Sequence, residues 1–110
     1  MNWIINWNVV LNNKTLSQYG FKLNDKIELT YSKEDYCFYI KKTTLGENKL
    51  RCHSEDGLSM WTGAKHIVEK ICGKNNKPIE RIYFDIVQDE YDKQNDTIKC
   101  IIDESYEHAE

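Results

Sequence analysis

The sequence is short of the residues from which several common active sites are built. It contains one proline, five glycines that never cluster, and only two arginines among its 110 residues. It has no glycine-rich phosphate loop, no Gly-x-Ser-x-Gly turn and no His-Glu-x-x-His helix. Because phosphate-binding loops, serine hydrolases and zinc proteases depend on those patterns, we predict a protein that is not an enzyme and that uses no cofactor.

The sequence also lacks the features of an exported or membrane-spanning chain. No apolar run approaches the roughly 20 residues that a spanning helix needs, and the first residues form neither a basic region nor an unbroken apolar stretch. We therefore expect no secretion and no membrane contact. Cysteines without an export signal favour reduced thiols, so we expect a cytoplasmic protein with apolar cysteines in its core. The four are Cys37, Cys52, Cys72 and Cys100.

A zinc site is not expected, because the cysteines and histidines have the wrong spacing. The cysteines form no Cys-x-x-Cys pair, and Cys52 is adjacent to His53. Ligand pairs of one zinc ion are usually about two to four residues apart, and adjacent residues on a strand point to opposite faces. We predict no metal site.

Charge is unevenly distributed along the chain, although the formal net charge is only -3. Residues 82–110 hold two lysines against nine acidic residues, whereas residues 36–81 hold nine basic against five acidic residues. An acidic end of this kind is unsuited to binding phosphates, so nucleic acid is not the expected partner. The acidic run that includes Asp89, Glu90 and Asp92 could dock a basic partner or mimic nucleic-acid phosphates, and a merely solvated surface is the alternative.

Hydrophobic periodicity predicts mainly strands and one helix. Every odd position from Trp3 to Leu11 is apolar, which is typical of a strand. Further alternation predicts strands over 26–31, 36–41, 79–88 and 97–103, and residues 49–54 are expected to return from the strand over 36–41 as a hairpin. Apolar residues at three- and four-residue steps predict a helix over 58–72.

From residue 36 onward the predicted order is strand, turn, strand, helix, strand, loop, strand, and this order resembles the ββαββ plan of the ubiquitin-like β-grasp family. The turn Leu45-Gly46-Glu47 resembles the first turn of that family, and Leu16-Ser17-Gln18-Tyr19-Gly20 resembles a motif of its C-terminal half. The family's core pattern is matched by Phe38, Ile40, Leu50, Cys52, Leu58, Trp61, Val68 and Ile71.

The resemblance implies an α+β fold, with a mixed sheet packed on one helix. A chain of this length favours one domain, in which residues 36–103 form the β-grasp-like core, residues 1–33 an extra two-stranded β segment, and residues 104–110 an acidic tail. The short first segment cannot cover its own apolar face. It must extend the same sheet, form a second layer, or pair with a second copy in a homo-oligomer.

The resemblance implies a rigid sheet whose exposed face, or an edge strand, binds another protein. The chain ends in Ser105-Tyr106-Glu107-His108-Ala109-Glu110 without the Gly-Gly that conjugated members of the family need, so we expect no conjugation. The expected partner-binding residues are Trp3, Trp7, Tyr39, Tyr83, Asp89, Glu90 and Asp92. The aromatic residues among them could instead pack the second face of the sheet.

Two further functional hypotheses stay open beside this non-catalytic interaction module. One is a small acidic inhibitor from a phage or mobile element, similar to anti-CRISPR proteins, that blocks a nucleic-acid-binding protein. The other is a subunit of an obligate assembly.

Overall fold

The computed structural model describes residues 2–5, 7–46, 48–52, 59–63, 65–73 and 82–103. The strands are β1 (Asn2–Ile5), β2 (Asn8–Asn12), β3 (Lys26–Ser32), β4 (Cys37–Lys42), β5 (Asn48–Lys49), β6 (Arg51–Cys52), β7 (Ser59–Gly63), β8 (Ile82–Ile86) and β9 (Thr97–Ile102). The helices are α1 (Asn13–Gln18), α2 (Lys65–Cys72) and the 3₁₀ helix η1 (Gln88–Glu90).

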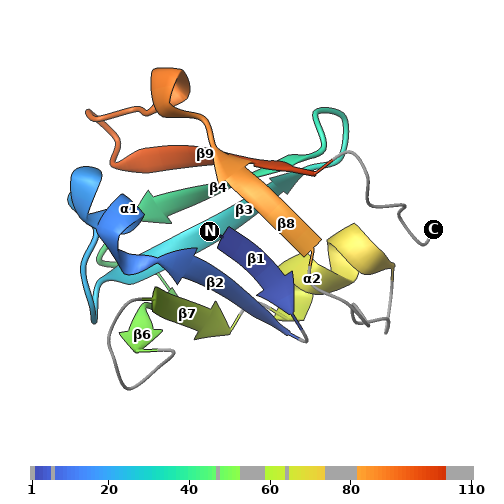
Figure 1. The fold of residues 1–110 in the computed structure, drawn as a ribbon, viewed down its shortest axis with the longest axis horizontal. Coiled ribbons are helices and arrows are strands. Elements are labelled where there is room, and N and C mark those ends of the chain that lie inside the picture. The colour runs from blue at the N-terminus through green and yellow to red at the C-terminus, as the bar shows by residue number, and fades with distance from the viewer. Residues whose placement is uncertain are drawn as a thin grey trace.

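All described strands belong to one sheet, in the order β5-β3-β4-β9-β8-β1-β2-β7-β6, and every pair is antiparallel. The seven longer strands curl so strongly that β3 and β4 lie behind β1 and β2 in Figure 1. The two outermost strands of the order, β5 and β6, are neighbours in the chain and are separated only by Leu50. The first and last strands of the order therefore meet in one short segment.

Leu50 joins the two ends of the curled sheet. β5 pairs with β3 and β6 pairs with β7. The Leu50 N–H donates to the Asp25 carbonyl at 3.0 Å, and the Leu50 carbonyl accepts from the Asn24 N–H at 2.9 Å. The Leu50 side chain is fully buried. Each of the seven longer strands consequently has a hydrogen-bonded neighbour on both sides.

The interior of the curled sheet is filled by apolar side chains from alternate strand positions. The rings of Phe38 and Phe84 meet edge to face with 4.9 Å between their centroids, a favourable aromatic geometry. In Figure 1, α1 lies at the left of the curled sheet and α2 at the lower right, and both helices contribute side chains to the same core. On α2 the buried side chains are Ile67, Val68, Ile71 and Cys72, and on and after α1 they are Leu16, Tyr19 and Phe21.

The predicted α+β class with a ββαββ core is wrong. Its mixed sheet is replaced by an antiparallel sheet, and strands from the first 35 residues lie between those of the expected core. Specifically, β3 lies between β4 and β5, while β1 and β2 lie between β8 and β7. The order of elements along the chain is compatible with many strand neighbours, so a matching order did not determine the fold.

The hairpin predicted from residues 36–54 does not form. β4 pairs with β3 and β9, whereas residues 48–49 pair with the far side of β3. The loop after β4 therefore crosses the start of β3, where the Thr43 N–H donates to the Lys26 carbonyl at 3.0 Å.

Only the second half of the predicted helix is helical. Residues 59–63 form β7, which pairs with β2 along its whole length and with β6. Five residues are too few for periodicity to distinguish a strand from a helix, and the backbone ladder on both sides decides the outcome. The predicted core residue Leu58 lies outside the described residues, as do the side chains of Cys52 and Trp61.

Residues 1–33 extend the same sheet, which was one of the three arrangements left open. β1 pairs with β8 and β2 pairs with β7. The single strand predicted from Trp3 to Leu11 is a hairpin in which Trp3 faces Val10 and Ile4 faces Val9. Because odd residues of β1 pair with even residues of β2, the odd positions do not share one face.

Three of the predicted strands are confirmed. The strands predicted over 26–31 and 97–103 correspond to β3 and β9, and β8 lies within the predicted 79–88. Cys37, Cys72 and Cys100 are buried, in agreement with the prediction of apolar cysteines in the core. Neither α1 nor α2, the α-helices in the described part of the chain, has the length and apolar character that crossing a bilayer requires. The predicted tail over 104–110 lies outside the described residues.

The crossing loop generates a stability prediction at Gly46. A Cβ atom at Gly46 would overlap the Ile27 carbonyl oxygen and come within 2.7 Å of its carbonyl carbon. We expect Gly46→Ala to lower the free energy of unfolding by about 2–3 kcal/mol, because backbone atoms of β3 must move. Urea unfolding measures the loss.

Gly20→Ala is the matched control for this prediction. Gly20 has a φ of +77° and no atom within 4 Å of an added Cβ, so only the left-handed backbone opposes the substitution, at about 1 kcal/mol. Equal losses in the two variants would contradict close packing at Gly46.

Candidate functional site

Three apolar side chains lie close together on the outer face of the sheet. Trp3 on β1 is directly opposite Tyr83 on β8. Ile101 on β9 is opposite Asp85, two residues along the strand from Tyr83, so Ile101 and Tyr83 are diagonal neighbours on one face. Tyr83 and Ile101 are each 40% exposed, and Trp3 is half-buried.

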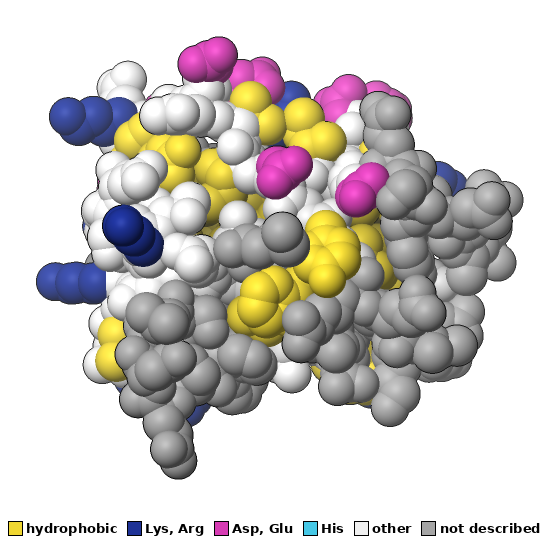
Figure 2. Space-filling view, in the orientation of Figure 1, with side chains coloured by type: hydrophobic (Ala, Val, Ile, Leu, Met, Phe, Trp, Pro, Cys, Tyr) yellow, Lys and Arg dark blue, Asp and Glu magenta, His cyan; other side chains and the backbone are white. Residues whose placement is uncertain are grey.

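Carboxylates flank these side chains. Asp85 and Asp103 are both exposed, and the Asp103 N–H donates to the Tyr83 carbonyl at 2.9 Å, which fixes Asp103 beside Tyr83. Figure 2 shows hydrophobic side chains over β1 and β8 with acidic side chains next to them. We call Trp3, Tyr83, Ile101, Asp85 and Asp103 the outer patch.

Tyr39 extends the same face on β4. It is half-buried and directly opposite Lys99 on β9. Cys37, two residues earlier on β4, is directly opposite Ile101. A hydrogen bond with the Cys37 thiol is the main cause that raises the pKa of Tyr39, followed by burial. The strand register places Tyr39 at the border of the outer patch.

The predicted acidic residues border the outer face at the opposite end of β9 from Ile101. The Glu90 carboxylate forms an ion pair with the Lys99 ammonium, with 3.2 Å between the nitrogen and the oxygen. A hydrogen bond with Glu90 is the main cause that raises the pKa of Lys99. Hydrogen bonds from Asn95 lower the pKa of Asp92. All three acidic residues, Asp89, Glu90 and Asp92, are exposed.

Trp7 lies apart from the other predicted partner-binding residues. It is half-buried in the turn between β1 and β2, packs against the core, and has the Lys65 ammonium 5.5 Å from its ring centroid. A cation at this distance is attracted to the ring. Trp7 therefore has a structural environment of its own beside α2.

The structure thus brings together Trp3, Tyr83 and, at the border, Tyr39, but it adds residues that the sequence interpretation missed. Ile101, Asp85 and Asp103 were not predicted as site residues. Ile101 had a signal, because adjacent residues on a strand face opposite sides and Ile101 precedes Ile102, which is fully buried.

Neither the arrangement of possible metal ligands in the described ranges nor comparison with known proteins indicates a further site. Within the described ranges, no group of three or more His, Cys, Asp or Glu residues is placed to hold a metal ion. Comparison with known proteins finds no matching family model, no similar curated protein and no similar solved structure.

Tyr36, which packs against the core, gives a prediction for alkaline pH. Burial is the main cause that raises its pKa from 10.0 to about 12, with smaller contributions from Tyr31, Cys72 and Asp103. Since the folded pKa exceeds the unfolded one, the contribution of Tyr36 to stability is complete below pH 10 and is lost between pH 10 and about 12. We expect Tyr36→Phe to lose less of its unfolding free energy than the wild type over that range, measured by urea unfolding. Parallel losses in both proteins would contradict the raised pKa.

Proposed function

We propose that this protein is a non-catalytic protein-binding module whose outer patch docks a partner with a basic surface. The proposal rests on the observation that two 40% exposed apolar side chains, Tyr83 and Ile101, are diagonal neighbours on one face of the sheet. Tyrosine is enriched at protein interfaces, where an apolar centre is usually surrounded by a polar rim. Trp3, directly beside Tyr83, enlarges the apolar centre.

The closed sheet favours docking on a face over pairing at an edge. Strand addition requires an unpaired strand edge, and each of the seven longer described strands has neighbours on both sides. The inner face is filled by the core. The outer face is therefore the part of the sheet that remains accessible to a partner.

The charges around the outer patch favour a basic partner. Asp85 and Asp103 are exposed at the patch, and Asp89 and Glu90 extend the acidic character along the chain. Complementary charge mainly speeds encounter and sets specificity, while the apolar centre holds the complex. A partner surface with Lys or Arg around an apolar side chain fits both features.

Ile101→Ser tests this proposal directly. The substitution removes apolar contact area from the patch but should change folding stability by no more than about 0.5 kcal/mol, as is usual for surface positions. We expect proteins captured by the wild type from a lysate of the source cells to be lost from the Ile101→Ser capture, as quantified by mass spectrometry.

Leu45→Ser is the matched control, because Leu45 is 89% exposed and lies in the loop after β4, away from the outer patch. It should retain the partners that Ile101→Ser loses. A captured set that is the same for both variants and the wild type would contradict docking on the outer patch.

The acidic-inhibitor hypothesis is separable by charge substitution. The Lys99 ion pair partly neutralises Glu90, which favours the exposed Asp85 over Glu90 as a charge that meets a partner. We expect Asp85→Asn to weaken binding of the captured partner, and the triple variant Asp89→Asn, Glu90→Gln, Asp92→Asn to have little effect. The reverse result, with binding that collapses as salt is raised, would favour the inhibitor.

A further inference from the structure

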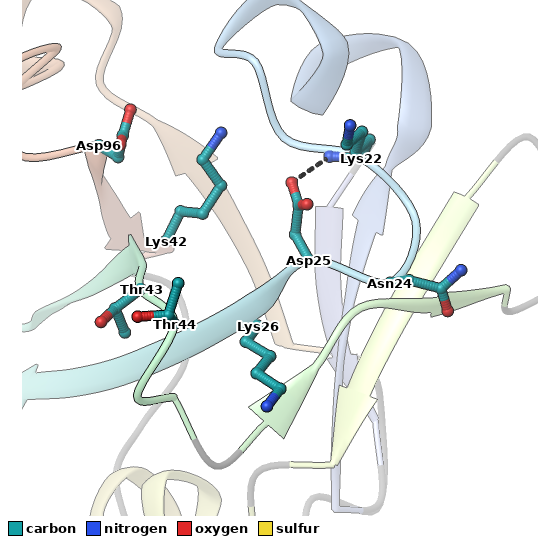
Figure 3. Close-up of a pocket in the computed structure, with 8 residues that line it drawn as sticks. All are labelled: Lys22, Asn24, Asp25, Lys26, Lys42, Thr43, Thr44 and Asp96. Atoms are coloured by element: carbon teal, nitrogen blue, oxygen red, sulfur yellow. Dashed lines mark hydrogen bonds between the residues drawn. The ribbon is translucent and has the colours of Figure 1, made fainter.

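A cleft with a volume of 510 Å³ lies at the end of the sheet where β3 begins and β4 ends. Residues 22–26 form one wall, residues 42–44 form the other, and Asp96 from the loop before β9 completes it. Figure 3 shows the Asp25 carboxylate between Lys42 and Lys22, and Lys26 extending away from both of them. We call this the lysine cleft. It is separate from the outer patch.

The Lys42 ammonium is held in place within the lysine cleft. Its Nζ donates to the Gly20 carbonyl at 3.0 Å and lies 5.8 Å from the centroid of the Phe21 ring. The Lys42 backbone N–H donates to the Asp96 carbonyl at 2.9 Å. A lysine restrained at both its backbone and its ammonium loses less conformational freedom when it binds a ligand.

Lys26, which lines the cleft, has a like-charged neighbour just outside the lining. Lys26 on β3 is directly opposite Lys49 on β5, and both side chains are exposed. Like charges directly opposite each other in a sheet are destabilising. An anion bound between these two ammonium groups would relieve the repulsion.

The three lysines of the cleft outnumber its two carboxylates, Asp25 and Asp96. Among the residues that the structure describes, none of the ammonium groups of Lys22, Lys26 and Lys42 has a carboxylate within 4.0 Å. The Asp25 carboxylate instead accepts the Lys22 backbone N–H at 2.9 Å, which fixes the turn.

We propose that the lysine cleft binds a small molecule that carries at least two phosphate groups. One group would lie at Lys42, and the other at Lys26 and its cross-strand neighbour Lys49. Ammonium groups bind phosphates through charge-assisted hydrogen bonds. Hydroxyls of Thr43 and Thr44 in the cleft wall supply additional donors for phosphate oxygens.

A small ligand fits the cleft better than a nucleic-acid strand does. No aromatic side chain is among the described residues that line the cleft, and single-stranded nucleic acid is usually bound by stacking its bases on aromatic rings. Asp25 and Asp96 on the cleft surface would also repel a continuous phosphate backbone. Two separate anionic groups held at Lys42 and at Lys26 can avoid the Asp25 carboxylate, which is turned toward the Lys22 backbone N–H.

Titration with tripolyphosphate at constant ionic strength tests the proposal, with calorimetry for affinity and backbone amide NMR shifts for location. Shifts should concentrate in residues 22–26 and 42–44. Inorganic phosphate, which has one group, should bind at least about tenfold more weakly, because it cannot reach both ends. Lys42→Met and Lys26→Met should each lower the tripolyphosphate affinity about threefold to fivefold, and the exposed Lys33→Met in the turn after β3 should leave it unchanged.

Lys49→Met distinguishes a built site from general attraction to positive charge. It should raise the urea midpoint of the ligand-free protein, because the repulsion with Lys26 is removed, and it should lower tripolyphosphate affinity. Three results would each overturn the proposal: an equal loss in Lys33→Met and Lys42→Met, equal affinity for phosphate and tripolyphosphate, or tighter binding of a short single-stranded oligonucleotide than of tripolyphosphate.

Discussion

The rest of the structure depends on the backbone pairing of one short segment, residues 48–52, with both ends of the curled sheet. Leu50 hydrogen-bonds to the Asn24–Asp25 turn and buries its side chain, while β5 and β6 on either side of it pair with β3 and β7. Without this segment β3 and β7 would each present an unpaired edge, and exposed edges invite association with other chains. The crossing loop at Gly46 is a direct consequence, because the chain must pass β3 to reach this position.

This closure limits where the protein can present its chemistry. The inner face is used by the core, and the edges of the longer strands are used by their neighbours. Binding surfaces are left to the outer face and to the loops at the ends of the sheet. The outer patch occupies the first location, on β1, β8 and β9, and the lysine cleft occupies the second, where β3 begins and β4 ends. The two sites therefore differ in chemistry, the first apolar and acidic and the second basic.

Strand positions were largely predictable from the sequence, whereas strand neighbours were not. Alternation located β3 and β9, because one face of each strand is buried. It failed at β7, where five residues also fit a helical step. Pairing between segments distant in sequence has no local signal, so neither the closure at Leu50 nor the ββαββ error could be detected beforehand. The lysine cleft was not recognised for the same reason, because its lysines, Lys22, Lys26 and Lys42, come from two separate segments that meet only in the fold.

The position of Lys26 opposite Lys49, at the edge of the lysine cleft, follows from the same strand pairing that closes the sheet. The register that places Lys26 opposite Lys49 also places Leu50 beside Asp25. A slip of one residue would separate the lysines, but it would also turn Leu50 out of the core, because side chains alternate between faces. Burying a leucine stabilises by about 1.5–3 kcal/mol, whereas a cross-strand pair changes stability by no more than about 1 kcal/mol. The burial of Leu50 therefore wins, and the two ammonium groups are held together at the rim of the cleft, where an anion can use them.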